Sequence, residues 1–549
     1  MDRKEIPVID LFAGPGGLSH GFASFSDPAL AFRIKLSIEK DEVAHRTLSL
    51  RAFLRQFKNP PPEYYQYIRG KRIKREDLEA RYPEQWKAAY KEARRWELGV
   101  TPFREVSTAI KEAVSGYPYW ALLGGPPCQA YSVAGRSRMK HSKSFSGDKK
   151  HTLYREYLKI VAVHQPAVFV MENVKGILTS VYGSREQDQP IFFQILQDLR
   201  NPYAAVADDK DVALLLPRVR HRYRIYSFVT RSPEGKGPDI LAPDDFIIRC
   251  EDWGVPQMRH RVILFGVRSD IGIEPPILSE LFRHETTSVE DVIHGLPRVR
   301  SRLSKGDSPK AWLSAIRKIA ARGILSAIGN QKVRKMVEKS ATVLRKRIAT
   351  GKPFFKGNYR PRKLIGWLWD DALNGVIQHE ARSHMPSDLI RYFFAACAAQ
   401  KIGISPKLRD FPITLLPNHR NAKAMASGVR STGMRQRMDF PDRFRVQIKG
   451  HPSSTVTSHI AKDGHYYIHY DHKQCRSLTV REAARLQTFP DSYYFAGNRT
   501  QQYHQVGNAV PPLLAFKIAR VVATVIHQSS EDNGKGSVHA STEGGLTVD

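Results

Sequence analysis

Cys128 stands in a setting that favours a reactive thiol. It lies in GGPPCQAYS (residues 124–132), directly after the apolar run YWALLGG. Pro126 and Pro127 fix their own φ angles and push the residues before them toward extended backbone, so the lead-in to the thiol is stiff. A lone cysteine is more often a small buried hydrophobe. The choice between the two depends on which other groups the chain brings to the same place.

An acid and two cations offer themselves as partners of this thiol. The apolar run AVFVMENV ends in Glu172, and an acid at the exit of a buried strand is costly unless it is paired or has a function. In GVPQMRHRVILFGV, Gln257, Arg259 and Arg261 alternate, so they share one side of an extended chain. Guanidinium groups there could bind a phosphate or a base oxygen and help hold the thiol as thiolate.

A glycine turn and a second acid indicate a nucleoside site. Gly14, Gly16 and Gly17 follow a strand-like run and open a helix, where backbone can approach a ligand closely. Glu39 ends the next strand, where its carboxylate could accept hydrogen bonds from ribose hydroxyls. The spacing lacks the GxGxxG form, so S-adenosylmethionine, which carries no phosphate, fits better than NAD.

The elements that must position these residues alternate regularly. Apolar runs at residues 6–12, 33–39, 119–125, 167–174 and 261–267 read as strands, with helical stretches between them. This alternation predicts an α/β fold, with a parallel sheet and helices on both faces. The carboxyl edge of such a sheet is where ligands bind.

Three stretches interrupt the alternation. Residues 57–100 are charged and read as a helical insertion, and residues 271–450 lack the pattern altogether. Within the latter, helices are expected around residues 311–328 and 333–348, with Ile316, Ile319 and Ala320 at core spacing. The tail from Gln528 has no apolar periodicity and is predicted to be disordered. A chain of 549 residues exceeds what one core usually organises, so two domains are expected.

The charge points to a polyanionic partner. The net charge is +32, and residues 298–363 hold 20 Lys and Arg against two acids. Nucleic acid is the partner that best offsets such an excess. Four scattered cysteines without a CxxC pair argue against a zinc site and a disulfide framework, and suit a reducing cytoplasm. No apolar run long enough to span a bilayer and no signal peptide are apparent, so we expect no membrane association.

Six segments, in this order, resemble the DNA cytosine-5 methyltransferase family. They are DLFAGPGGLSHGF, GGPPCQAYS, ENV, QMRHR, RSLTVREAARLQTFPDSY and QVGNAVPPLLAFKIA. The resemblance covers about residues 6–270 and 451–525. It implies a Rossmann-like methyltransferase domain at 1–270, a smaller inserted target-recognition domain at 271–450, a return to the catalytic domain at 451–527 and a disordered tail at 528–549.

The resemblance also implies a mechanism. A cytosine rotates out of duplex DNA, the Cys128 thiolate attacks C6, and Glu172 donates a proton to N3. C5 then takes the methyl group of S-adenosylmethionine. By the same resemblance Arg261 contacts the cytosine O2 and Arg259 the nearby phosphate or thiol environment, two roles that could be exchanged. The implied cofactor residues are Phe12, Gly14, Gly16, Gly17, Glu39, Pro126, Asn508 and Val510.

DNA contacts are implied in two places. Residues 134–152 correspond to a loop that closes over DNA, with Gln129 filling the space of the flipped base, and residues 419–440 are a candidate base-reading loop. The implied DNA-binding residues are Gln129, Ser132, Arg136, Arg138 and Gln257. Two departures concern the adenine: Lys40 stands where the family often has an aromatic ring, and Glu97 is the nearest candidate for an adenine-contacting acid.

The expected role is that of a bacterial or phage modification enzyme. Its partners would be double-stranded DNA and, in function though not necessarily in physical contact, a cognate restriction endonuclease. The protein would be a monomer in the bacterial cytoplasm, associated with the nucleoid, and would bind no metal. Two alternatives stay open on the sequence: a tRNA cytosine-5 methyltransferase, and a DNA-binding regulator without catalysis. The cysteine, acid and arginine set counts against the second.

Overall fold

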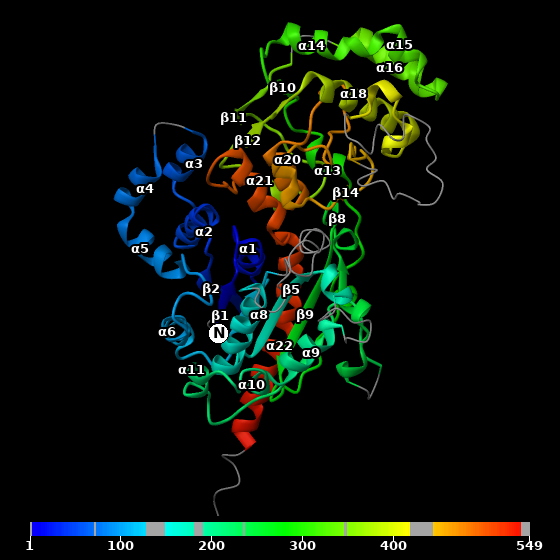
Figure 1. Cartoon of the computed structure of the whole chain (residues 1–549). Coiled ribbons are helices and arrows are strands. Elements are labelled where there is room, and N and C mark those ends of the chain that lie inside the picture. The colour runs from blue at the N-terminus through cyan, green and yellow to red at the C-terminus, as the bar shows by residue number, and fades with distance from the viewer. Residues whose placement is uncertain are drawn as a thin grey trace, which may run out of the picture.

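The chain folds into two lobes, one built on a central sheet and one built mainly of helices and short strand pairs (Figure 1). The computed structural model describes residues 3–70, 73–127, 149–180, 190–233, 237–344, 348–417 and 443–539. In Figure 1 the sheet lobe lies below and carries both the first and the last helix, whereas α14, α15 and α16 lie at the far end of the second lobe.

The sheet has eight strands in the order β3-β2-β1-β4-β5-β9-β6, with β7 also paired to β9. Its strands are β1 (Lys4–Leu11), β2 (Leu30–Ile38), β3 (Ala93–Arg94), β4 (Ala121–Gly124), β5 (Val168–Val174), β6 (Tyr223–Tyr226), β7 (Ile247–Arg249) and β9 (His260–Arg268). All five predicted strands are present. The short strands β3, β6 and β7 were not predicted, because none of them forms an apolar run of its own.

The expectation of a purely parallel sheet is wrong at one side. Strands β3, β2, β1, β4 and β5 are parallel neighbours, but β9 runs antiparallel to β5, β6 and β7. In the register, Arg261 at the start of β9 lies opposite Val174 at the end of β5. The reversal therefore brings the residues that precede β9 to the carboxyl edge of the parallel strands.

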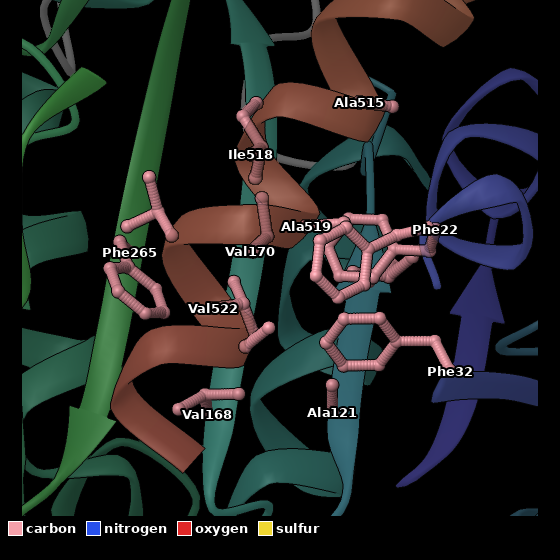
Figure 2. Packing of buried hydrophobic residues seen from close by; sticks show 14 of the residues in the cluster. Phe22, Phe32, Ala121, Val168, Val170, Phe265, Ala515, Ile518, Ala519 and Val522 are labelled. Atoms are coloured by element: carbon pink, nitrogen blue, oxygen red, sulfur yellow. The ribbon is translucent and has the colours of Figure 1, made fainter. Parts of the chain in front are cut away.

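Helices cover both faces of the sheet. On one face α1 (Gly17–Ser24) and α22 (Pro512–His539) pack on alternate side chains of the strands, and Figure 2 shows Phe22, Val170 and Ile518 meeting there. The other face is covered by α6 (Phe103–Val114), α8 (Lys149–His164) and α9 (Ile191–Arg200). Strand residues alternate between the two cores, as the pleat requires.

The predicted insertion at residues 57–100 is helical. It contains α3 (Pro62–Ile68), α4 (Arg75–Arg81) and α5 (Pro83–Glu92), and it ends in β3 at the sheet edge. These helices pack on α2 (Glu42–Arg55), with the rings of Phe53 and Trp86 stacked 4.5 Å apart. Leu373 and Ile377 of the second lobe belong to the same apolar cluster, so the insertion connects the two lobes.

The remaining elements complete the two lobes. Their helices are α10 (Pro202–Ala205), α11 (Lys210–Ala213), α12 (Leu278–Leu281), α13 (Val289–Ile293), α14 (Pro309–Arg317), α15 (Arg322–Ser326), α16 (Gln331–Val343), α17 (Ile365–Leu368), α18 (Pro386–Ile402), α20 (Val480–Leu486) and α21 (Arg499–Asn508). The paired short strands are β8 (Gln257–Met258) with β14 (Ser453–Ser454), β10 (Arg302–Leu303) with β13 (Ser383–His384), and β11 (Gly351–Lys356) with β12 (Gly375–Glu380).

The packing shifts the predicted domain boundaries. Ile271 and Leu278 belong to the core of the first lobe, and the second lobe begins near Val289. At the other end, residues 456–509 share a core with α13, α17 and β12, so this segment belongs to the second lobe. Only Val510 and α22 rejoin the sheet.

Two local expectations are also corrected. Ile316 and Ile319 are fully buried, but Ala320 is exposed, because a 3-10 turn over Lys318–Ala320 ends the helical repeat there. The tail does not begin at Gln528: α22 continues to His539, and the buried Ser529 donates a hydrogen bond to the Tyr119 hydroxyl.

One stretch has the length and apolarity of a membrane span, contrary to expectation. It runs over Arg499–Glu531, and 83% of its most apolar window is buried inside the molecule. Burial of this kind is that of a core helix, here α22 on the face of the sheet.

Candidate active site

A cavity of about 620 Å³ opens at the carboxyl edge of the parallel strands. The ends of β1, β2, β4 and β5 all contribute to its wall, and so do α21 and the residues just after it. Parallel strands bring their carboxyl ends to one edge, which is why residues distant in sequence meet here. Of the predicted cofactor residues, those lining the cavity are Phe12, Gly14, Gly17, Glu39, Pro126, Asn508 and Val510.

The glycine turn forms the floor between β1 and α1. Phe12 and Gly14 both have a left-handed φ of 56°, and a Cβ on Gly14 would meet no atom within 4 Å. At Gly17 the opposite holds, because a Cβ would lie 2.3 Å from the Val510 carbonyl oxygen. Gly16 is outside the lining. It lies beneath the turn, where a Cβ would come within 3.0 Å of Leu48, and its contact with the cofactor stays a prediction.

Glu39 is held rigidly at the end of β2. One carboxylate oxygen accepts from the backbone N–H of Gly14 at 2.8 Å and the other from Asp41 at 2.7 Å. Burial raises the pKa of Glu39, while these backbone hydrogen bonds oppose the rise. Each oxygen keeps a second lone pair, so the carboxylate can still accept from two ligand hydroxyls.

The charged side chains around the cavity fit a nucleoside without phosphates better than a phosphorylated one. Lys40 is the one Lys or Arg among the described residues of the lining, and it forms an ion pair with Glu97 at 3.0 Å. Trp96 stands beside Glu97 in the wall. Sequence reasoning missed Trp96, although it supplies the aromatic surface that is absent at position 40. S-adenosylmethionine, a nucleoside with an amino acid tail, matches this set.

Glu172 reaches the same cavity from β5. A Cβ on Gly125 would lie 3.2 Å from a Glu172 carboxylate oxygen, so the backbone that leads to Cys128 passes close to this acid. Asn173 donates to the Pro126 carbonyl oxygen at 3.4 Å. Pro126 and Pro127 both line the cavity. The acid and the stiff lead-in predicted to meet are therefore adjacent.

Arg261 faces Glu172. Its Nε lies 2.8 Å from a Glu172 carboxylate oxygen, and the two side chains are only 12% and 14% exposed. The pair is possible because β9 begins where β5 ends. It places a cation and an acid side by side at the edge of the cavity, as the sequence predicts.

Arg259 and Gln257 are placed differently from what the sequence suggests. Arg259 is 2% exposed and donates to the carbonyl oxygens of Val456 and Gly507, and burial lowers its pKa to about 9. Gln257 is fully buried; it donates to Leu486 and Gln487 and accepts from the Val456 N–H. Neither side chain is available to DNA in this arrangement, so both join the second lobe to the strand edge.

Several predicted residues lie outside the described ranges. They are Cys128, Gln129, Ser132, Arg136 and Arg138, together with most of the predicted loop at 134–152 and the candidate base-reading loop at 419–440.

Asp10 is a further polar residue of the cavity wall that sequence reasoning did not identify. It is fully buried near the end of β1, with Ser19 of α1 beside its carboxylate and no ion pair to a cation among the described residues. Burial raises its pKa to about 7. The signal in the sequence was an acid within the apolar run IPVIDLF. In the described part of the chain no three His, Cys, Asp or Glu side chains gather as metal ligands would.

Comparisons with known proteins identify the family of the chain. The family model "C-5 cytosine-specific DNA methylase" matches residues 83–203 and 246–524. The type II methyltransferase M.Bpa9945I of Bacillus paralicheniformis is 31% identical over 540 residues, which cover 95% of this chain and 99% of the relative. M.DdeI of Desulfomicrobium norvegicum is 25% identical, over 94% and 88% of the two chains. A solved S. pombe Dnmt2 methyltransferase aligns over 95% of this chain and 99% of its own, with a TM-score of 0.34 and 11% identity. The chain belongs to the C-5 cytosine-specific DNA methylase family and is a DNA (cytosine-5-)-methyltransferase.

Proposed function

We propose that this enzyme is the modification methyltransferase of a type II restriction–modification system, and that it methylates C5 of a flipped cytosine within a specific duplex sequence. The observation that carries the chemistry is the Glu172–Arg261 pair beside Gly125, at the mouth of a nucleoside-sized cavity. The names of the relatives support the biological role.

The cavity residues have distinct roles toward S-adenosylmethionine. Glu39 accepts from the ribose hydroxyls, Trp96 packs against the adenine, and the turn at Gly14 admits the amino acid tail. Asn508, at the end of α21, and Val510, where the chain rejoins the sheet lobe, close the wall. Bound there, the cofactor supplies an electrophilic methyl group at the sulfonium.

The protein's own residues then activate the cytosine. The base leaves the stack, since C5 and C6 are inaccessible inside a duplex. The Cys128 thiolate forms an Sγ–C6 bond while Glu172 delivers a proton to N3, so the electron pair moves to C5, which takes up the methyl group. Loss of the C5 proton to a base, with return of the N3 proton to the Glu172 carboxylate, expels the thiolate and restores the neutral ring.

Arg261 has a positioning role in this scheme. In the resting enzyme it neutralises Glu172 at 2.8 Å. A cytosine O2 entering beside it competes for the guanidinium.

The catalytic proposal is tested by trapping the covalent step. A duplex with 5-fluorocytosine at the target, incubated with enzyme and S-adenosylmethionine, should yield a denaturant-resistant adduct at Cys128, because fluorine cannot leave as the proton does. Cys128→Ala should give no adduct, and Glu172→Gln should form it at least roughly 100-fold more slowly. Turnover by Cys128→Ala would refute the mechanism.

The basic second lobe supports DNA as the partner. Lys310, Arg317, Lys318, Lys332 and Lys335 are exposed on α14, α16 and the turn between them. Such charges contact phosphates and make affinity salt-dependent. We place the enzyme in the bacterial cytoplasm at the nucleoid, acting as a monomer with a cognate endonuclease that cleaves the same unmethylated site. Sequencing 5-methylcytosine in DNA from expressing cells would identify the site; random or absent methylation would contradict the role.

A further inference from the structure

The second lobe holds a cavity of its own, of about 710 Å³, between α13, α16, the end of α18 and the segment 446–474. None of the described residues in its wall lines the cofactor cavity. The mechanism makes no use of it. Its wall combines three chemical features that a nucleotide would use.

The first feature is an aromatic and apolar interior. Tyr470 stacks on His469 with ring centroids 4.5 Å apart and an angle of 29° between the planes. Met336 of α16 and Ile448 are half-buried in the same wall, and Val343 at its edge is 52% exposed. A flat ring supported by a second ring is the kind of surface on which a nucleobase stacks.

The second feature is a free hydrogen-bond acceptor. His472 is 4% exposed, and its Nδ1 lies 2.7 Å from the Gln400 side-chain oxygen. Because that oxygen can only accept, Nδ1 carries the proton and Nε2 is left as the acceptor. Among the described residues Nε2 has no partner. A buried ring nitrogen of this kind favours a ligand that brings an N–H group.

The third feature is a cationic rim. Arg298, Lys339, Lys449 and Lys473 surround the cavity. Arg298 is paired with Asp471 and Lys449 with Glu290, but Lys339 and Lys473 have no carboxylate within 4 Å in the described ranges. Both are exposed, so a phosphate could reach them without losing existing ion pairs.

We propose that this cavity binds a single nucleotide, with the base on Tyr470, a base N–H directed at His472, and the phosphate at Lys339 and Lys473. The nucleotide could belong to a bound DNA strand or be free in solution, and the two sources share this chemistry. The strand source rests on the proposed function; the free source does not.

The test uses the full chain, with dAMP as probe and saturating S-adenosylmethionine to occupy the cofactor cavity. Titration calorimetry on the wild type should give saturable binding. Lys339→Glu should weaken it by roughly tenfold or more, the effect of losing a charge-assisted contact. Lys335→Glu is the matched control: it lies one turn earlier on α16, is also exposed, changes the charge equally and is not part of the cavity wall. It should change dAMP affinity by less than about twofold.

A second variant separates base from phosphate. Tyr470→Leu removes the stacking surface, so it should lower the affinity for dAMP by roughly tenfold and leave the affinity for inorganic phosphate unchanged. The source is then read by adding duplex DNA. If DNA abolishes dAMP binding, a strand nucleotide occupies the cavity; if both bind together, the ligand is a free nucleotide.

Two results together overturn the proposal. The wild type shows no saturable dAMP binding, and Lys339→Glu and Lys335→Glu lower the affinity for DNA by the same factor. The proposal is also overturned if the two charge reversals lower the affinity for dAMP by the same factor. Methylation of DNA by the same preparations is measured in parallel. Loss of methylation with intact dAMP binding would count against the proposed function and leave the nucleotide site standing.

Discussion

Hydrocarbon makes up most of the core in the sheet lobe, whereas the second lobe buries three arginines almost completely. In the sheet lobe, aromatic and aliphatic side chains of α1 and α22 interlock with strand residues (Figure 2). In the second lobe Arg476, Arg481 and Arg485 are at most 1% exposed. The first core is mainly hydrocarbon with a few buried polar groups such as Asp10, whereas charged side chains cross-link the second.

The three arginines act as cross-links between distant segments. Arg485 pairs with Asp491 at 2.7 Å and also donates to the carbonyl oxygens of Val292 and Tyr359. Arg476 similarly forms two 2.6 Å hydrogen bonds to Glu482. All of these residues belong to, or are bound by, the motif RSLTVREAARLQTFPD. The charged residues of this motif, although the motif resembles one of a family of enzymes, therefore stabilise the second lobe.

The largest expected effect comes from breaking one of these pairs. Arg485→Met leaves Asp491 charged and buried without its partner, which costs about 3–5 kcal/mol. Native-state hydrogen exchange should show lost protection in residues 289–296 and 480–491, with the sheet strands largely unaffected. The double variant Arg485→Met/Asp491→Leu should recover most of the loss, because no lone charge remains. Equal loss in both lobes would contradict their separate organisation.

A steric change should act on the sheet lobe instead. A Cβ on Gly21 of α1 would lie 2.4 Å from the Ala515 Cβ and 2.5 Å from the Pro512 carbonyl oxygen. Gly21→Ala should therefore cost up to about 3 kcal/mol, through separation of α1 from α22. Gly323→Ala in α15 is the control, because its Cβ would meet nothing within 4 Å. Thermal unfolding should show that substitution to be stabilising by about 0.5–1 kcal/mol, since alanine loses less entropy in a helix.

The pH dependence of the sheet lobe follows from Asp10. Its pKa is raised to about 7 in the folded state, from an ordinary value of 3.8. The folded state therefore holds a proton that the unfolded state has lost between these values, and stability falls as pH rises through that window. Asp10→Asn removes this dependence, so from pH 5 to pH 8 the variant should gain about 2 kcal/mol relative to the wild type. Urea unfolding at the two pH values measures it; a constant difference would mean that Asp10 is ionised when folded.

Buried histidines in the second lobe give the opposite sign. Burial lowers the pKa of His379 and of His469 to about 4. These side chains are neutral when folded but take up protons when unfolded below about pH 6.5, so stability is complete above that pH and falls toward pH 4. Between pH 6.5 and 5, the unfolding free energy of the second lobe should fall less in His379→Gln than in the wild type, by roughly 1 kcal/mol or more. Hydrogen exchange in residues 375–380 is the readout.

The sequence predicts the sheet lobe well because its signals are local. Continuous apolar runs mark β1, β2, β4, β5 and β9, and the acids at the strand ends do meet at one cavity. What it could not show is the direction of β9. A parallel strand there would have placed Arg261 at the opposite edge from Glu172, and only the long-range pairing of β5 with β9 resolves this.

The second lobe was less accessible to prediction for a physical reason. Several of its stabilising contacts join residues 100 or more positions apart, such as Arg481 with the Ile377 carbonyl oxygen. No periodicity reports such a contact. The QMRHR motif shows the same limit. Alternation predicts that Gln257, Arg259 and Arg261 lie on one side of the chain, but it cannot predict that Gln257 and Arg259 are buried.

The position of α22 has a consequence for synthesis. This helix fills one face of a sheet whose first strand begins at Lys4, so that face stays uncovered until the ribosome has passed Pro512 and the helix has left it. Until then the nascent chain exposes an apolar surface, a state prone to aggregation and to chaperone capture. The sheet lobe of a newly made chain therefore cannot be complete, and its cofactor cavity cannot be closed, before α22 has been synthesised and has packed on the sheet.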